Sequence, residues 1–223
     1  MSEPAPGPRA IDPGDHSSGD LYRLLISMIV PRPIAWVGSR GADGGDNLAP
    51  FSFFMGVGSN PPMIALSVAR GSGGALKDTA RNLLGSGEFT LSLPMVSEAA
   101  LVAGSAAPLP AGVSEFSALG IDQVEGLRVG ACRPAAAALS LECVVRHALD
   151  LDSTHLFVAE VLMFHVAPGL LEDDPRPRVR DGATDPLARL GGADYAALGR
   201  RFSQPTPSAA AVLAAFAAAQ GEP

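Results

Sequence analysis

The sequence has few of the residues on which covalent or metal-based chemistry depends. Its 223 residues include two cysteines, Cys132 and Cys143, with no CxxC pair, and four histidines without paired metal-ligand spacing. This excludes a disulfide framework and a zinc knuckle, and we expect both thiols to be small buried groups. The GxGxxG, GxxxxGK[ST], GxSxG and HExxH motifs are also missing, which disfavours Rossmann dehydrogenases, P-loop NTPases, serine hydrolases and zinc proteases.

Positive charge is scarce as well. The chain has 16 basic residues against 23 acidic ones, a formal net charge of −7 and a pI of about 5.0. Such a chain has no cationic field for a phosphate backbone, so we expect no nucleic-acid partner. The longest apolar stretch, Ala209–Ala219, is shorter than the ~20 residues of a membrane helix. The N-terminus lacks the basic and apolar runs of a signal peptide, so we expect a cytoplasmic protein without membrane association.

The composition along the chain divides it into three regions. Residues 1–19 are rich in proline and glycine and are predicted to form a flexible arm. Residues 20–200 contain the periodic segments and are predicted to form one folded domain. Residues 201–223 form an alanine-rich tail, which is predicted to be helical over 207–220 and to pack on the domain or on a partner subunit.

Hydrophobic periodicity predicts a mainly-β fold with peripheral helices. A helix should begin at Asp20 as its N-cap and end before Pro31, with its apolar face formed by Leu21, Leu24, Leu25, Met28 and Ile29. Strands are predicted over 33–39, from about 47, and over 62–68, 88–93, 139–145 and 155–165. The last is apolar on both faces and should be central. Short strands without a βαβ rhythm indicate a barrel or sandwich.

A first group of polar residues lies at the start of a short helix, predicted over 77–84 and closed by Gly85. A glycine-rich linker, residues 71–74, precedes it, and Lys77 is the only lysine of the chain. The N–H groups of a first helical turn, a lysine and the Thr79 hydroxyl together suit a phosphate group. An ordinary capped surface helix is the alternative interpretation.

A second group lies in the segment from Asn47 to Phe54. Pro50 cannot donate to a strand ladder, so its strand should be at a sheet edge or broken by a bulge. Free backbone groups, the polar Asn47 and Ser52 and several phenylalanines then suit a flat heteroaromatic ring with polar edges. An aromatic core strand with an edge proline is the alternative.

A third group opens the strand predicted at 155–165. His155 lies at a strand end near a loop, where it could meet a substrate, and Glu160 needs a partner if it is buried. A surface histidine and a salt-bridged glutamate are the alternatives. The stretch between residues 97 and 130 is predicted to contain only short helices and loops.

Nine short segments follow one another along the chain: Val30–Arg40, Asn47–Phe54, Asn60–Val68, Lys77–Asn82, Gly87–Leu93, Ser114–Phe116, Leu141–Cys143, His155–Val161 and Arg189–Tyr195. No single one is specific by itself. Taken in order, they resemble the flavin reductase-like family of FMN-binding split barrels, and the match covers roughly residues 20–197.

The resemblance implies a homodimeric split β-barrel of Greek-key type with FMN bound noncovalently near the subunit interface. By position, the residues lining the ring and ribityl chain are Ser39, Asn47, Leu48, Ala49, Pro50, Phe51 and Ser52. Those holding the phosphate are Lys77, Asp78, Thr79 and Asn82. Arg32, Tyr195 and the candidate catalytic His155 match family positions close to the flavin or its open face. The family usually has glycine where Ala159 stands, so the extra methyl group narrows the space beside that strand.

The implied function is an FMN-dependent oxidoreductase. It would take a hydride from NADH or NADPH and pass electrons to free flavin, a partner oxygenase or another acceptor. Hydride transfer needs no catalytic triad, and the chemistry belongs to the cofactor. An FMN-binding electron-transfer protein of the flavoredoxin type, without its own nicotinamide site, is the alternative. A barrel that binds no flavin and acts as a structural or ligand-sensing subunit is a third, because one fold serves several functions.

Overall fold

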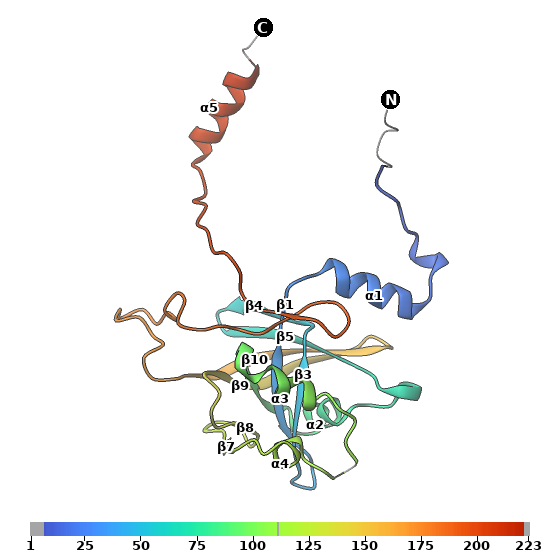
Figure 1. Cartoon of the computed structure of the whole chain (residues 1–223). Coiled ribbons are helices and arrows are strands. Elements are labelled where there is room, and N and C mark those ends of the chain that lie inside the picture. The colour runs from blue at the N-terminus through green and yellow to red at the C-terminus, as the bar shows by residue number, and fades with distance from the viewer. Residues whose placement is uncertain (1–6, 111, 221–223) are drawn as a thin grey trace.

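The computed structural model describes residues 7–110 and 112–220, so the outer ends of the expected arm and tail, 1–6 and 221–223, lie outside the described residues. Figure 1 shows a sheet-rich body with α1 (Ser18–Met28) beside it, whereas α5 (Ala209–Gln220) stands away from it. No helix among the described residues is long and apolar enough to cross a bilayer.

The body is built on one antiparallel seven-stranded sheet in the order β3-β2-β6-β9-β10-β5-β4. Its strands are β2 (Ala35–Arg40), β3 (Asp46–Phe51), β4 (Phe54–Ser59), β5 (Pro62–Ala69), β6 (Glu88–Ser92), β9 (Leu139–Asp150) and β10 (Thr154–Val166). The predicted mainly-β class is confirmed, and β10 has a neighbour on each side as expected. The sequence pattern missed β4, because the apolar run from β3 continues into it.

The sheet curls because its two edge strands are consecutive in the chain. β3 ends at Phe51 and β4 begins at Phe54. A flat sheet of this size would hold its edges ~29 Å apart, whereas three Cα–Cα steps reach at most ~11 Å. The edges therefore approach each other at this end of the sheet, where the Ser67 N–H donates to the Phe53 carbonyl at 2.9 Å.

Hydrophobic residues pack on both faces of the curled sheet. One cluster fills its concave side and includes Val37, Leu66, Phe89 and Phe157. A second cluster contains Trp36, Leu48 and Val102. Successive residues such as Trp36 and Val37 enter different clusters because side chains alternate across a strand. Helices pack against both faces: Ala80 and Leu83 of the helix Asp78–Ser86 belong to the first cluster, whereas Val102 and Phe116 from two shorter helices belong to the second.

Short elements surround the sheet. The remaining helices are η1 (Pro13–Asp15), η2 (Ser72–Gly74), α2 (Asp78–Ser86), η3 (Val96–Glu98), α3 (Ala99–Gly104) and α4 (Glu115–Ala118). The remaining strands are β1 (Arg32–Pro33), β7 (Gln123–Glu125), β8 (Cys132–Pro134), β11 (Ala188–Arg189) and β12 (Tyr195–Ala196). β1, β11 and β12 form a small sheet, and β7 pairs with β8.

Three details of the expected helices differ in the structure. The N-cap of α1 is Ser17 rather than Asp20, because the Ser17 hydroxyl accepts from the Asp20 N–H at 3.2 Å. Its apolar face is also largely uncovered in the single chain: Ile26 is the buried residue of α1, whereas Met28 is 71% exposed. Helix α2 ends two residues later than expected, at Ser86, and its C-cap is Gly87 instead of Gly85; the φ of 71° at Gly87 suits glycine.

Close packing between β2 and β8 depends on Gly38. A Cβ atom there would lie 2.0 Å from the Cys132 carbonyl oxygen and 2.5 Å from Thr90 Oγ1. That oxygen accepts a hydrogen bond from Thr90 Oγ1 at 2.7 Å. The strands can approach this closely only because residue 38 has no side chain.

Glu142 fastens the loop between β7 and β8 to the sheet. Its carboxylate is fully buried and accepts from the backbone N–H groups of Leu127 (2.8 Å), Arg128 (2.6 Å) and Val129 (3.2 Å), and it contacts His165 Nε2 at 2.6 Å. Burial raises the pKa of this carboxyl group, but the Leu127, His165 and Arg128 hydrogen bonds outweigh it and hold the pKa below its ordinary value.

Candidate functional site

Strand β3 has an open edge, as Pro50 predicts. It is the first strand in the sheet order and pairs only with β2. The Leu48 N–H points away from β2, because it donates to Glu115 Oε2 at 2.8 Å. Residues of an antiparallel strand alternate between its two edges, so the Pro50 carbonyl faces outward with Leu48. The open edge of β3 therefore presents backbone carbonyl groups beside Pro50.

Glu115, at the start of α4, closes one side of this edge. It is 9% exposed, and its hydrogen bond to Leu48 satisfies an N–H that has no partner strand. The sequence analysis did not select it. The only signal for Glu115 was that the Ser114–Phe116 segment belongs to the family resemblance. Its contact with Leu48 could not be predicted from local pattern, because the two residues are 67 positions apart in the sequence.

Four polar side chains meet between β2, β3 and the start of α2. Asn47 Nδ2 donates to Thr79 Oγ1 at 2.9 Å and lies 3.4 Å from Ser39 Oγ. Asn82 Nδ2 donates to the same Ser39 oxygen at 3.0 Å. Ser39 and Thr79 are each 1% exposed. All four residues were predicted site residues, and the fold brings them into one hydrogen-bonded cluster, which we call the polar cluster.

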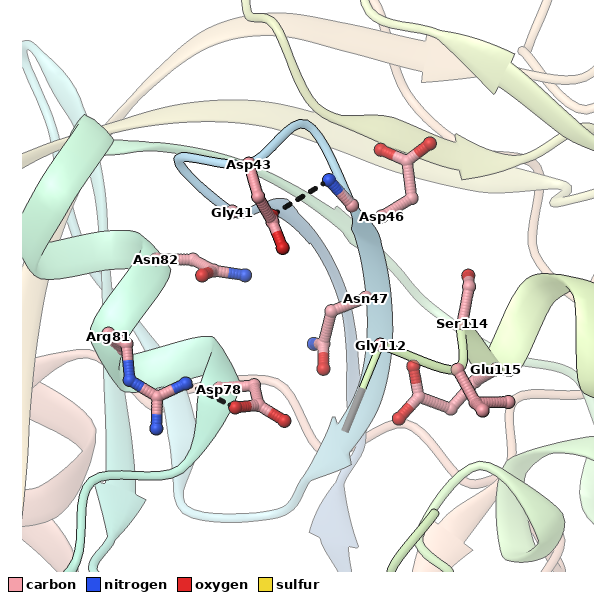
Figure 2. Close-up of a pocket in the computed structure, with 12 residues that line it drawn as sticks. Gly41, Asp43, Asp46, Asn47, Asp78, Arg81, Asn82, Gly112, Ser114 and Glu115 are labelled. Atoms are coloured by element: carbon pink, nitrogen blue, oxygen red, sulfur yellow. Dashed lines mark hydrogen bonds and ion pairs between the residues drawn. The ribbon is translucent and has the colours of Figure 1, made fainter. Parts of the chain in front are cut away.

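The start of α2 carries donors that the protein does not use. Lys77 is the N-cap residue and makes no side-chain cap hydrogen bond, so the first-turn N–H groups are left for other acceptors. The Lys77 side chain is exposed and forms no ion pair with any residue that the structure describes. Asp78 lies in the first turn but is paired with Arg81 (Figure 2). This pairing reduces the repulsion that its carboxylate would exert on an anion.

A groove follows the open edge of β3, and three adjoining cavities form it. The first, about 230 Å³, is shown in Figure 2, where Asn82 on α2 and Asn47 on β3 project into the space between their two elements. The second, about 480 Å³, extends from Lys77 and Thr79 to Phe51. The third, about 170 Å³, continues past Ser52. Neighbouring cavities share lining residues, so we call them together the β3 groove.

The predicted site residues are distributed along this groove. Asn47, Asp78 and Asn82 line the first cavity. The second is lined by Asn47, Ala49, Pro50, Phe51, Lys77, Asp78 and Thr79. The third is lined by Pro50, Phe51, Ser52 and Tyr195. Leu48 is fully buried with its side chain in the core, so only its backbone faces the groove. Ser39 contributes through the polar cluster.

Arg32 and His155 lie elsewhere. Arg32 is 4% exposed, and its guanidinium donates to the carbonyls of Ile26, Ile29 and Leu190 and to Ser52 Oγ, so it contacts the groove only through Ser52. His155 is buried on β10, 3.7 Å from Asp150, and does not line any of the three cavities. Its assignment as a catalytic residue stays a prediction.

The groove contains no reactive thiol or metal centre within the described residues. Cys132 and Cys143 are buried, as predicted. Burial raises the pKa of the Cys132 thiol and raises that of Cys143 to about 12, so both stay protonated near neutral pH. No group of three or more histidine, cysteine or acidic residues in the described chain could hold a metal ion. The arrangement therefore suits binding: a phosphate at one end and a flat ring along the strand edge.

Comparison with known proteins gives consistent matches. The family model described as "Flavin reductase like domain" matches residues 27–184. The crystal structure of nitrilotriacetate monooxygenase component B from Bacillus cereus is 34% identical, with a TM-score of 0.83, and the match covers 90% of this chain and 100% of that one. The 2-nitrobenzoate 2-nitroreductase of Pseudomonas fluorescens is 25% identical, with a TM-score of 0.81 and coverages of 90% and 98%. An uncharacterised protein of Deinococcus radiodurans is 39% identical over 77% of each chain.

Proposed function

The chain belongs to the flavin reductase-like domain family, with its mainly-β split-barrel fold, and we propose that it is an oxidoreductase that binds FMN in the β3 groove. It would take electrons from NADH or NADPH. The observation that carries the proposal is the polar cluster under the start of α2, which adjoins both an unpaired lysine and a groove along an open strand edge.

The phosphate fits the start of α2. A phosphate is bound well by the free N–H groups and positive dipole of a helix N-terminus, and a lysine adds a point charge. Lys77 and Thr79 line the same cavity there, and the half-buried Asn47 amide and the buried Asn82 amide hold Thr79 and Ser39 in fixed orientations. We assign Lys77 and Thr79 to phosphate binding, with Asp78 and Asn82 at its margin.

The ring fits the edge of β3. Outward carbonyl groups beside Pro50 can accept hydrogen bonds from ring N–H groups, and Phe51 and Pro50 supply apolar walls. We place the ribityl chain between this edge and the polar cluster, close to Ser39, Asn47 and Ala49. Ser52 lies at the far end of the ring, where Arg32 Nε fixes its hydroxyl from behind at 3.2 Å.

When bound, FMN supplies the redox chemistry by accepting a hydride and releasing electrons to an acceptor. The chain's own contribution is to hold the ring against one strand edge, to neutralise the phosphate and to leave one ring face open. Glu115 keeps the Leu48 N–H occupied, so the edge offers acceptors rather than a mixture of groups. We infer no general base, because no histidine or carboxylate is among the described residues that line the third cavity, at the end of the groove assigned to the ring.

The acceptor is proposed from the comparisons. Similarity to a monooxygenase component supports an oxygenase partner that receives reduced flavin. Free flavin and other electron acceptors are the alternatives. A flavoredoxin-like electron carrier without a nicotinamide site is the second candidate.

In either case we propose a homodimer with FMN near its interface. Exposed apolar side chains on α1 and β4, such as Met28 at 71% and Met55 at 60%, support it.

The test begins with the purified protein. We expect flavin absorbance or stoichiometric FMN uptake, followed by rapid reduction of the bound flavin on mixing with NADH or NADPH. Protein that binds FMN but reacts with neither nicotinamide would refute the reductase and favour the electron carrier. Protein that fails to bind FMN in a titration would refute both. Sedimentation of the FMN-loaded protein tests the dimer.

A further inference from the structure

The small sheet next to the third cavity places two arginines opposite each other. β1 and β11 are antiparallel, and their register pairs Arg32 with Arg189. Directly opposed residues of an antiparallel pair project to the same face, and like charges in that arrangement destabilise the pair. Local rules of this kind are broken mostly where function requires it.

No carboxylate compensates this pair of positive charges. Neither Arg32 nor Arg189 forms an ion pair in residues 7–110 and 112–220. The chain has 23 acidic residues and a net charge of −7, so counter-charges are available but are not placed here. Burial lowers the pKa of Arg32; the interaction with Tyr22 opposes this shift, and repulsion from Arg189 adds to it.

The two arginines differ in what their donors still offer. Arg32 is buried and occupied by three backbone carbonyls and the Ser52 hydroxyl. Arg189 has one described hydrogen bond, from Nη2 to the Gly192 carbonyl at 2.5 Å. Its guanidinium lies 4.4 Å above the centre of the Tyr195 ring, which fixes its plane. The remaining donors of Arg189 are therefore oriented and unused.

The third cavity is where these donors can be reached. Its lining includes Arg189 and Tyr195, Tyr22 of α1, and Pro50 and Ser52 of the β3 edge. A molecule there would be surrounded by aromatic side chains. The Arg189 guanidinium would lie on one side of it, and the part of the β3 groove assigned to the flavin ring would lie on the other. An arginine without a carboxylate partner is suited to a carboxylate or phosphate oxygen.

We propose that Arg189 binds the anionic group of the substrate that meets the flavin, in the third cavity, with Tyr195 orienting the guanidinium and Arg32 keeping the local field positive. The inference rests on the proposed function. The ligand is a flat ring that carries an anionic group, either the pyrophosphate of a nicotinamide dinucleotide or the carboxylate of an aromatic acid.

The test measures equilibrium binding to the FMN-loaded protein by calorimetry, with two matched pairs of probes. Benzoate is compared with neutral benzamide, and oxidised NAD with neutral nicotinamide. Arg189→Gln should weaken binding of the anionic member of a pair by about tenfold or more, and that of its neutral partner by less than about twofold. An effect on benzoate identifies a carboxylate site, and an effect on NAD identifies a pyrophosphate site.

Arg128→Gln is the matched control, because Arg128 is exposed, lines none of the three cavities and loses the same charge. Equal affinities in the two variants, or no binding of either anion to the native protein, would overturn the inference. Should Arg189→Gln not fold, the same titrations are repeated with the native protein at rising salt concentration. The affinity for the anionic probes must then fall with ionic strength, while the affinity for the neutral probes stays constant. A parallel FMN titration distinguishes failure of this inference from failure of the proposed function. If the native protein does not bind FMN, it is the proposed function that is refuted.

Discussion

Replacement of Lys77 by methionine tests the phosphate end of the groove. Methionine keeps most of the length of the side chain and removes only its charge. The native side chain is exposed and has no ion pair within the described residues, so the folded protein loses no contact. We therefore expect the free energy of unfolding to change by less than about 0.5 kcal/mol, while FMN binding weakens.

The magnitude follows from the position of the lysine. A hydrogen bond to a charged group contributes about 1.5–3 kcal/mol. Because Lys77 is exposed at the mouth of the groove, salt and water screening put its contribution at the lower end. A loss of about 1.4 kcal/mol corresponds to a tenfold rise in Kd. The backbone N–H groups of α2 and the Thr79 hydroxyl remain, so binding should be weakened rather than abolished.

The assay is a fluorescence titration of FMN into the native protein, Lys77→Met and the control Arg128→Met. The control loses the same charge at an exposed position that lines none of the three cavities. Affinity for riboflavin, which lacks the phosphate, should be equal in all three proteins. Native FMN affinity in a folded Lys77→Met protein would place the phosphate elsewhere and refute the reasoning.

Two further predictions concern the scaffold. Gly38→Ala places a Cβ 2.0 Å from the Cys132 carbonyl oxygen and should cost about 1–3 kcal/mol of stability, seen as a lower Tm. Gly199→Ala meets no atom within 4 Å and lies outside α1 and β4, so it should melt near the native temperature; equal Tm values would contradict the packing argument. Because the folded-state pKa of Glu142 is depressed, its contribution to stability is present above the ordinary value of 4.5 and is lost as pH falls through the lower folded value. Glu142→Gln should thus be less stable than native at neutral pH, with the difference shrinking in acid, and denaturant titrations showing a constant difference would argue against this role.

Much of the fold was predictable because it depends on local signals. Alternating residues located β6, apolar runs located β5 and β10, and Pro50 identified an edge strand without any knowledge of its neighbours. The start of α2 was also predicted, because the signals for a helix N-terminus lie in a few neighbouring residues. The N-cap and the buried face of α1 and the end of α2 were less well predicted, since caps and burial depend on what lies nearby.

The sequence by itself determined that a lysine directly precedes α2, that a proline marks β3 as an edge strand and that no nucleophile or metal set is present in motif form. Only the tertiary structure decided which residues meet. It joined Asn47 to Thr79 and Leu48 to Glu115, and it opposed Arg32 to Arg189, which are 157 positions apart in the sequence. The physical reason is that strand pairing and sheet curvature bring distant segments together through burial of the whole core, and no short window of sequence contains that information.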